Sequence, residues 1–320
     1  MPEISIVVPV YNSADCLREL VRRIDASVRP GYELILVNDG SRDASWRTIS
    51  TLTVANGVIL GVDLRRNSGQ DNALMAGLRL ATGDFVVIMD DDLQHAPEDI
   101  EALHQACVAG NHDVCFANFE SRQHKGWKNW GSWLNGKMAE VLVDKPRHIY
   151  LSPFKIMRGD VVRDLCRYQG PYPYVDGQLM ATTSHLGQID LPHHQRFSGA
   201  STYTLWRSIK VWSKHLTGFS VFPLRAASLL GGCFAVFGFL LGLFFMLRHL
   251  FVGVDVEGWT SLMCITLFTG GVILLCLGVM GEYIGRSYLL LNAKPQYSIR
   301  ETVRLGVVAP HDAPVPDSRD

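Results

Sequence analysis

Three aspartates, Asp90, Asp91 and Asp92, stand side by side directly after an apolar run, and Gln94 follows two residues later. Neighbouring carboxylates repel one another unless a positive charge compensates them. An Asp-x-Asp pair with an amide oxygen two residues further on supplies hard oxygen ligands, which Mg²⁺ and Mn²⁺ prefer. We therefore predict that Asp90, Asp92 and Gln94 bind a divalent cation.

The same aspartates can alternatively cap a helix that begins near Pro97, because acidic residues are favourable at helix N-termini. We favour the metal site because all three stand in a row at the end of a predicted strand. A protein-bound Mg²⁺ usually keeps several ligand positions open and binds substrate phosphates through them. The predicted substrate is therefore a nucleotide.

The elements that must position these residues follow from the apolar pattern of the N-terminal third of the chain. Short β-rich runs alternate there with longer segments, which predicts an α/β domain with a mostly parallel sheet. The predicted strands are residues 4–10, 33–37, 57–63, 85–89 and 113–117, and the clearest helices are residues 15–26 and 70–81.

In an open parallel sheet, ligands bind in the crevice beyond the carboxyl ends of the strands. Tyr11 and Asn12 follow the first predicted strand, and Asn38 and Asp39 follow the second. The three aspartates follow the fourth. We expect these three loops to converge on one site.

Two long apolar segments lie in the C-terminal part of the chain. Residues 226–247 and 262–281 contain no charged side chain over 22 and 20 positions, and each is long enough to cross a bilayer. Lysines and arginines cluster before the first segment and after the second, so the positive-inside rule predicts that both ends are cytoplasmic. We expect a multi-pass protein of the inner membrane with a cytoplasmic catalytic domain.

These patterns predict four parts. Residues 1–202 form the cytoplasmic domain, residues 203–225 amphipathic juxtamembrane helices, residues 226–285 the two membrane helices, and residues 286–320 a C-terminal tail. No cleavable signal peptide is expected, because the chain begins directly with a predicted strand. The end of the tail, residues 307–320, is rich in proline and polar residues, and we expect it to be disordered.

Composition excludes other classes of function. The formal net charge of −1 gives no attraction to nucleic acid, so no nucleic-acid partner is expected. The seven cysteines contain no CxxC pair, so neither a disulfide framework nor a zinc site is predicted.

Several motifs together resemble one enzyme family. The motifs are IVVPVYN, LVNDGSRD, RRNSGQDNALMAGLRLATGDFVVIMDDDLQHAPEDI and MGEYIGRSY, and they resemble the inverting family-two glycosyltransferases with the GT-A fold. More narrowly, the chain resembles the polyprenyl-phosphate glycosyltransferases. That group includes dolichol-phosphate mannose synthases and bacterial undecaprenyl-phosphate sugar transferases with two C-terminal membrane helices. The resemblance covers about residues 3–300.

The resemblance implies a donor site in the loops after the strands. It assigns to the nucleotide Pro9, Tyr11, Asn12, Asp39, Gln70, Asp90 and Asp91, and to the metal and the diphosphate Asp90, Asp92 and Gln94. Ser13 stands where the family has glutamate, so one polar contact to the nucleotide differs. UDP is the expected carrier by family analogy, with GDP and dTDP as alternatives.

On the acceptor side, the resemblance implies cations that receive a lipid phosphate. Arg122 matches the family position best, and arginine can bind a phosphate in bidentate fashion. Lys128 and Ser132 are assigned to the same phosphate, whereas Lys125 has a solvated surface role as its alternative. Arg196 is placed at the diphosphate, so the implied catalytic set is Asp92, Arg122 and Arg196.

Three tryptophans, Trp127, Trp130 and Trp133, follow at a spacing of three. This spacing predicts a membrane-interface anchor, with an ordinary core stripe as the alternative. Thr202 replaces the lysine that the family usually has, so the sugar cannot be copied from the best-known members. The neighbouring His193 and His194 are interpreted as solvated loop residues.

The implied reaction joins a sugar to a polyprenyl phosphate, and a phosphomonoester with a second pKa of about 6 is mostly an anionic nucleophile at neutral pH. No strong general base is then required, and direct displacement inverts the anomeric centre. Two alternatives stay open: a hydroxyl acceptor with Asp176 as the base, and a non-catalytic nucleotide-binding membrane scaffold. A processive polysaccharide synthase is disfavoured because only two spans are predicted. The family also implies a homo-oligomer, expected to be a tetramer.

Overall fold

The computed structural model describes residues 2–119, 146, 149–170, 173–192, 222–252, 258–292, 295–305 and 307–310. The chain divides into two units, one formed by Met1–Thr202 with Ala293–Asp320 and the other by Tyr203–Asn292. The first unit contains the predicted catalytic domain. The second contains the two long apolar helices.

A single nine-stranded sheet runs through the described part of the first unit, in the order β7-β5-β6-β4-β1-β2-β3-β8-β9. Its parallel centre consists of β1 (Ile4–Val10), β2 (Tyr32–Asn38), β3 (Ile59–Leu64) and β4 (Phe85–Ile88). Every residue of β1 and β2 is buried, as expected for parallel strands that are covered on both faces.

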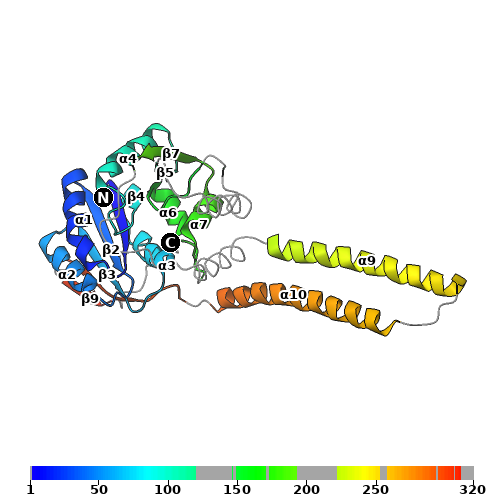
Figure 1. The fold of residues 1–320 in the computed structure, drawn as a ribbon. Coiled ribbons are helices and arrows are strands. Elements are labelled where there is room, and N and C mark those ends of the chain that lie inside the picture. Colours follow the sequence, from blue (N-terminus) through cyan, green and yellow to red (C-terminus); the bar gives the residue numbers. More distant parts are fainter. Residues whose placement is uncertain are drawn as a thin grey trace, which may run out of the picture. The chain divides into compact units, whose positions relative to one another are not determined.

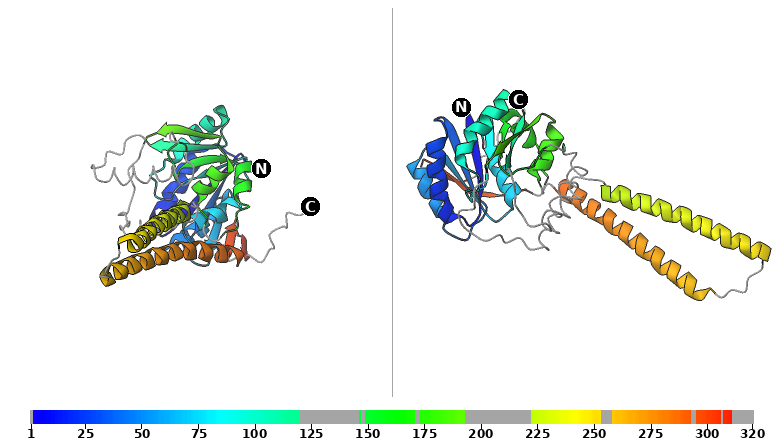
Figure 2. Two further views of the ribbon diagram at one scale, coloured as in Figure 1. Left: turned by 90° about the vertical axis from the view of Figure 1, so that its right-hand side faces the viewer. Right: turned by 45° about the horizontal axis from the view of Figure 1, so that its top comes forward.

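Helices cover both faces of this sheet (Figures 1 and 2). One core cluster receives side chains from α1, α2 and α4, and the other receives side chains from α3, α6 and α7. The bounds are α1 Ala14–Ser27, α2 Ser45–Ala55, α3 Gln70–Leu78, α4 Ile100–Ala109, α6 Gly159–Leu165 and α7 Val175–Thr182, with a short 3₁₀ helix, η1, at Pro97–Asp99.

The remaining strands extend the sheet on both sides. On one side, β6 (Lys155–Arg158) lies antiparallel between β4 and β5 (Val114–Phe119), and β5 pairs in parallel with β7 (Leu186–Leu191). Only β6 and β8 run against the direction of the central strands among the described residues. The predicted α/β class with a mostly parallel sheet is confirmed.

Helix α3 passes unusually close to the sheet. A Cβ on Gly77 would lie 2.4 Å from Cγ1 of Val7 on β1, so glycine is required for this approach. The sequence pattern predicted a helix over residues 70–81, but α3 ends at Leu78. The chain turns there, with the Leu80 amide donating to the Gly77 carbonyl at 3.0 Å.

The C-terminal segment differs from the prediction of a disordered end. Residues Ile299–Arg304 form β8, which pairs antiparallel with β3, and Val307–Pro310 form β9, which pairs with β8. The prediction of disorder was therefore wrong for Val307–Pro310, and residues 311–320 lie outside the described residues. After the apolar helices, the chain thus contributes two strands to the sheet of the first unit.

The second unit contains two long helices, α9 (Phe222–Val252) and α10 (Trp259–Leu291). Their most apolar windows, Ala227–Phe244 and Phe268–Leu291, have mean hydropathies of 2.1 and 1.6 and are 6% and 0% buried. The core helix of a soluble protein would instead be mostly buried. Both helices are long and apolar enough to cross a membrane. The predicted juxtamembrane helices fall largely on residues 203–221, which lie outside the described residues.

Candidate active site

The loops after β1, β2 and β4 lie at one edge of the sheet, as predicted. The strand register aligns Val10 with Asn38, and Asn38 with Asp63, so β1, β2 and β3 end at the same level. The Met89 amide donates to the carbonyl of Val7 at 3.3 Å, which continues β4 alongside β1. Tyr11, Asp39 and Asp90 therefore lie in neighbouring loops, whereas Pro9 lies within β1 and Gln70 begins α3.

Loop 90–95 makes a sharp turn at Leu93, directly after its three aspartates. Leu93 has φ of 60° and is 2% exposed; such a backbone conformation is uncommon for a bulky residue and is often found at functional sites. The Gln94 amide donates to Oδ1 of Asp92 at 3.1 Å. Asp92 and Gln94 are thereby held together on one turn.

Asp90 is held from two directions. Its Oδ1 accepts a hydrogen bond from Nε2 of Gln70 at 2.9 Å, and its amide donates to Nδ1 of His95 at 3.3 Å. His95 is 6% exposed and stacks between Phe119 and Phe154, with ring centroids 5.5 and 5.3 Å away. The buried imidazole therefore anchors the backbone of the predicted metal loop.

The alternative role of these aspartates as helix caps finds no support. The residue before η1 is Ala96 and the residue before α4 is Asp99, and neither cap position has a side-chain capping bond. Within the described residues, Asp91 binds another loop and Asp92 binds its own turn. The three aspartates thus organise the sheet edge rather than a helix end.

Asp91 connects the metal loop to the loop after β1. Its Oδ2 accepts a hydrogen bond from the Tyr11 amide at 3.3 Å. Burial raises the pKa of Asp91, and this rise is opposed by hydrogen bonds from the Ser13 hydroxyl and the Tyr11 amide. Ser13, which replaces the glutamate of the family pattern, is therefore part of this contact.

The loop after β1 is also tied to the loop after β2. Asn12 has φ of 54°, a conformation that asparagine tolerates well. Its amide donates to Oγ of Ser41 at 3.0 Å, and its Oδ1 accepts from the Arg42 amide at 2.8 Å. The neighbouring Tyr11 side chain is 46% exposed, so its ring is accessible at the site.

Asp39 holds a further loop. It is 3% exposed, and its two carboxylate oxygens accept hydrogen bonds from the amides of Ser68 at 2.6 Å and Gly69 at 2.9 Å. Burial raises the pKa of Asp39, whereas these two amides lower it. In this arrangement Asp39 positions the loop that leads to Gln70, and a direct contact of Asp39 with a nucleobase stays a prediction.

A buried charged cluster lies at the start of β6. Lys155 is 3% exposed, forms an ion pair with Asp176 and lies 5.4 Å from the centre of the Phe116 ring. Asp71, adjacent to Gln70, faces the same cluster. Its own burial first and the charge of Asp176 second raise the pKa of Asp71 to about 6, and Lys155 opposes this rise. The candidate base Asp176 is therefore engaged with a buried cation.

The arrangement at the sheet edge suits a divalent cation that is shared with a ligand. Among the described residues, no three side chains of His, Cys, Asp or Glu gather into an all-protein metal cage. Asp90 and Asp92 are instead partly exposed carboxylates on one turn. A Mg²⁺ site usually uses one or two carboxylates plus substrate phosphates, so the residues fit such an ion.

The structure leaves several predicted site residues outside its described part. These are Arg122, Lys125, Lys128, Ser132, Arg196, His193, His194 and Thr202, together with the three tryptophans Trp127, Trp130 and Trp133. Their assignments to the acceptor phosphate, the diphosphate and the membrane interface stay predictions.

Sequence reasoning missed four residues that organise the site. Asp63 is an acidic residue near the carboxyl end of a parallel strand. The rule that found the other residues, polar side chains at the carboxyl ends of strands, could therefore also have found Asp63. His95, Lys155 and Arg300 carry no local signal, because their roles depend on partners that are brought close by the tertiary fold. Their contacts are to Asp90, Asp176 and Asp63.

Comparison with known proteins gives a matching family and close relatives. The family model "Glycosyl transferase family 2" matches residues 5–166. The undecaprenyl-phosphate 4-deoxy-4-formamido-L-arabinose transferase of Pseudomonas paraeruginosa is 32% identical over 307 residues, covering 94% of this chain and 90% of that protein. The enzyme of the same name from Shewanella sediminis is 33% identical over 304 residues, covering 93% and 92%.

A solved structure supports the fold class. Glucosyl-3-phosphoglycerate synthase from Mycobacterium tuberculosis, in complex with Mn²⁺, UDP-glucose and phosphoglyceric acid, matches with a TM-score of 0.51 at 17% identity, over 68% of this chain and 78% of that one. The GT-A class that the sequence motifs implied is thus confirmed. The family model spans the loops that follow the central strands, and the relatives cover both units of the chain. This chain therefore belongs to glycosyl transferase family 2 and is a glycosyltransferase.

Proposed function

We propose that this protein transfers a sugar from a nucleotide-sugar donor to undecaprenyl phosphate or a related polyprenyl phosphate. The observation that carries this proposal is the match to undecaprenyl-phosphate sugar transferases over 94% of the chain. That match extends beyond the catalytic unit through both apolar helices. A lipid acceptor explains why a nucleotide-binding sheet is joined to two helices of membrane-spanning length.

Asp90, Asp92 and Gln94 would hold Mg²⁺ or Mn²⁺ at the donor diphosphate. When bound, the cation would supply positive charge that offsets the negative charge on the departing nucleoside diphosphate. Gln70 holds Asp90 by the hydrogen bond described above, so the carboxylate keeps its orientation before the donor arrives. The nucleoside lies over the loops of Tyr11 and Asp39, with UDP as the proposed carrier.

The acceptor needs no deprotonation by the protein. An anionic oxygen of the lipid phosphate attacks the anomeric carbon as the bond from that carbon to the nucleoside diphosphate breaks, which inverts the anomeric centre. The protein's contribution is to align these atoms and to stabilise the leaving charge. We assign the acceptor phosphate to Arg122, Lys128 and Ser132, and a contact with the diphosphate to Arg196.

The alternative with a hydroxyl acceptor requires a free carboxylate base. Asp176 was the candidate, but its Oδ1 receives the ammonium of Lys155 in a site where Lys155 is 3% exposed. A carboxylate that compensates a buried cation is poorly placed to accept a proton in each turnover. This contact favours the lipid phosphate as the acceptor.

The proposed location is the inner membrane, with α9 and α10 as the two spans and both termini in the cytoplasm. The clustering of basic residues outside the spans supports this orientation. We also propose a homo-oligomer, with a tetramer as the expected state. In a membrane the glycines that line both helices would allow close helix packing.

The test is a transfer assay with the full chain in lipid nanodiscs. Purified protein and undecaprenyl phosphate are incubated with a panel of radiolabelled UDP-, GDP- and dTDP-sugars, with Mg²⁺ or with EDTA. The expected product partitions into organic solvent, is labile to mild acid and forms only with the metal. Labelling of a hydroxyl acceptor that is added in a parallel reaction, with no lipid-linked product anywhere in the panel, would contradict the proposal.

A further inference from the structure

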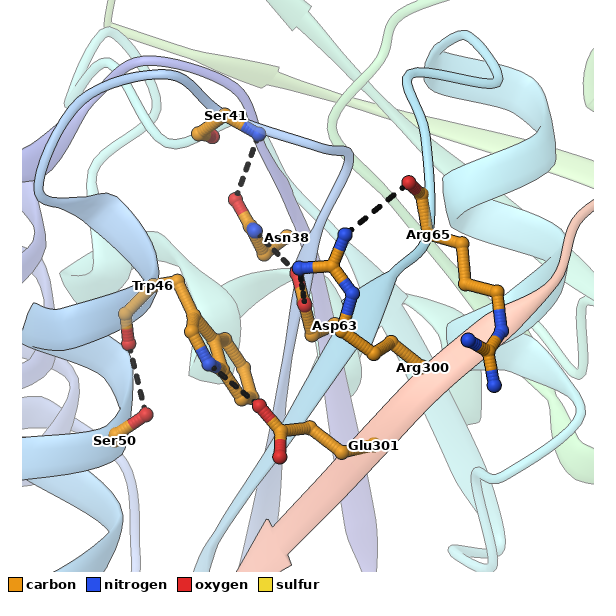
Figure 3. Close-up of polar contacts among 8 residues, drawn as sticks. All are labelled: Asn38, Ser41, Trp46, Ser50, Asp63, Arg65, Arg300 and Glu301. Atoms are coloured by element: carbon orange, nitrogen blue, oxygen red, sulfur yellow. Dashed lines mark hydrogen bonds and ion pairs between the residues drawn. The ribbon is translucent and has the colours of Figure 1, made fainter. Parts of the chain in front are cut away.

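A buried carboxylate links the C-terminal strand to the donor side of the site. Asp63 on β3 is 1% exposed. Its Oδ1 accepts a hydrogen bond from Nδ2 of Asn38 at 2.6 Å, and its Oδ2 forms an ion pair with Arg300 at 3.0 Å (Figure 3). A buried carboxylate without such partners would be costly, so Arg300 is the counter-charge of this position.

Arg300 reaches Asp63 because the strand is irregular at this point. In the pairing of β8 with β3, Glu301 lies opposite Asp63 and Ile299 lies opposite Leu64, with a shift of register between them. Arg300 is therefore the extra residue of a bulge, and bulges redirect a side chain. Burial raises the pKa of Asp63, and the contacts with Asn38 and Arg300 oppose this rise.

The guanidinium is linked to both loops that carry the nucleotide residues, to one directly and to the other through Asp63. Besides Asp63, Arg300 donates to the carbonyl of Arg65 at 3.3 Å, at the start of the loop that continues to Gln70. Through Asp63 it reaches Asn38, whose Oδ1 accepts from the Ser41 amide at 3.3 Å (Figure 3). Loop 38–41 and loop 65–69 are thus joined by Arg300 on one side and by the bonds of Asp39 on the other.

The two loops have little freedom at this junction. Gly40 has φ of 62°, and a Cβ on it would lie 2.6 Å from the amide nitrogen of Asn67. The loops are therefore in backbone contact where Asp39 crosses between them. A small displacement of either loop moves Asp39 and the start of α3, which carries Gln70.

We propose that Arg300 is a positioning residue for the nucleotide of the donor, so that the strand after the apolar helices completes the nucleotide site. This inference rests on the proposed function, since it assumes that loops 38–41 and 65–69 bind a nucleoside diphosphate. Arg300 acts through Asp63 and the Arg65 carbonyl and does not touch the reacting atoms. Its loss loosens the loops without removing a metal ligand.

The competing explanation is that Arg300 only stabilises the sheet. Two variants distinguish this structural role from the proposed positioning role. Arg304→Met removes the other arginine of β8, which lies opposite Leu60 at the far end of the strand. Glu301→Gln weakens the docking of β8 itself, because Oε1 of Glu301 accepts from Nε1 of Trp46 at 2.9 Å (Figure 3). Neither change removes a contact to loop 38–41 or loop 65–69 that Arg300 makes.

The experiment measures nucleotide affinity and kinetics in the full chain in nanodiscs. Calorimetry with UDP, GDP and dTDP in the presence of Mg²⁺ first finds the nucleoside diphosphate that the wild type binds most tightly. For that nucleotide, Arg300→Met is expected to weaken binding and raise the donor KM about five- to tenfold. This is less than the loss of a direct hydrogen bond to a charged group would cause, because Arg300 acts on the nucleotide only through the loops. The kcat and the acceptor KM should stay within about twofold, and Arg300→Lys should restore part of the affinity.

The outcomes distinguish this inference from the proposed function. If the wild type binds none of the three nucleotides, the proposed function fails. If the wild type binds one and Arg300→Met binds it equally well, the positioning role of Arg300 is refuted while the proposed function stands. If Glu301→Gln or Arg304→Met weakens nucleotide binding as much as Arg300→Met does, β8 merely stabilises the sheet. That result would also refute the positioning role of Arg300.

Discussion

Replacing Asp92 by asparagine is expected to abolish sugar transfer while the protein still folds. The substitution keeps the shape of the side chain but removes the charge that would bind the divalent cation. Metal stabilisation of a leaving group contributes several kcal/mol, and each 1.36 kcal/mol corresponds to tenfold in rate. We expect kcat to fall by about 10² to 10⁴, measured with donor and polyprenyl phosphate at saturation.

The matched control for Asp92→Asn is Asp84→Asn. Asp84 is exposed and directly precedes β4, so this variant makes the same chemical change at the opposite end of the strand. Its kcat should stay within about twofold of the wild type. Wild-type kcat in Asp92→Asn, or an equal loss in both variants, would remove Asp92 from the metal site.

The second large effect concerns stability. Lys155→Met leaves the half-buried carboxylate of Asp176 without its cation, and breaking a buried pair costs about 3–5 kcal/mol. Since 1 kcal/mol moves the Tm of a domain of this size by about 2–4 °C, we expect the Tm to fall by about 10 °C. Thermal unfolding followed by intrinsic fluorescence in nanodiscs measures this change.

The loss in Lys155→Met should also depend on pH. In the folded protein the pKa of Asp71 is raised to about 6 from its ordinary value of 3.8, and Lys155 holds it from rising further. Because the folded pKa is the higher one, the free energy of unfolding falls as the pH rises from 3.8 to about 6. Without Lys155 the pKa of Asp71 in the folded protein rises further, so the destabilisation continues to a higher pH. The fall in Tm should therefore be greater at pH 8 than at pH 5.

An exposed ion pair provides the control for Lys155→Met. Arg22 pairs with Glu19 at 2.6 Å, with 67% of the arginine side chain exposed. Surface pairs contribute only about 0–1 kcal/mol, so Arg22→Met should lower the Tm by less than about 3 °C and show little dependence on pH. A Tm change in Lys155→Met no larger than this would mean that the Lys155–Asp176 pair is not buried in the folded protein.

The sequence predicted the donor edge well because the relevant signals are local. Tyr11, Asp39 and Asp90 each follow an apolar run, and parallel strands necessarily bring their carboxyl ends to one edge. Knowing the strands was therefore sufficient to bring these residues together. The structure adds how they are held, for example that Asp39 accepts both amides of the following loop.

The role of the C-terminal strand could not be predicted in the same way. Arg300 and Asp63 are 237 residues apart, and no local pattern indicates which edge a late strand will join. The segment that contains Val307–Pro310 was interpreted as disordered from its proline and polar content. Its backbone nevertheless pairs with β8, because an exposed strand edge offers unpaired groups that a further strand can satisfy.

The central claim, that a divalent cation at Asp90 and Asp92 bridges to a nucleoside diphosphate, is tested most directly by phosphorus NMR. The nucleoside diphosphate that the wild type binds most tightly is mixed with the full chain, and Mn²⁺ is added at a level below that of the protein. We expect both phosphorus resonances of the bound nucleotide to broaden strongly with the wild type, and Asp92→Asn to abolish the protein-dependent part of this broadening. Equal broadening with Asp92→Asn, or nucleotide binding that is unchanged when Mn²⁺ is replaced by EDTA, would contradict it.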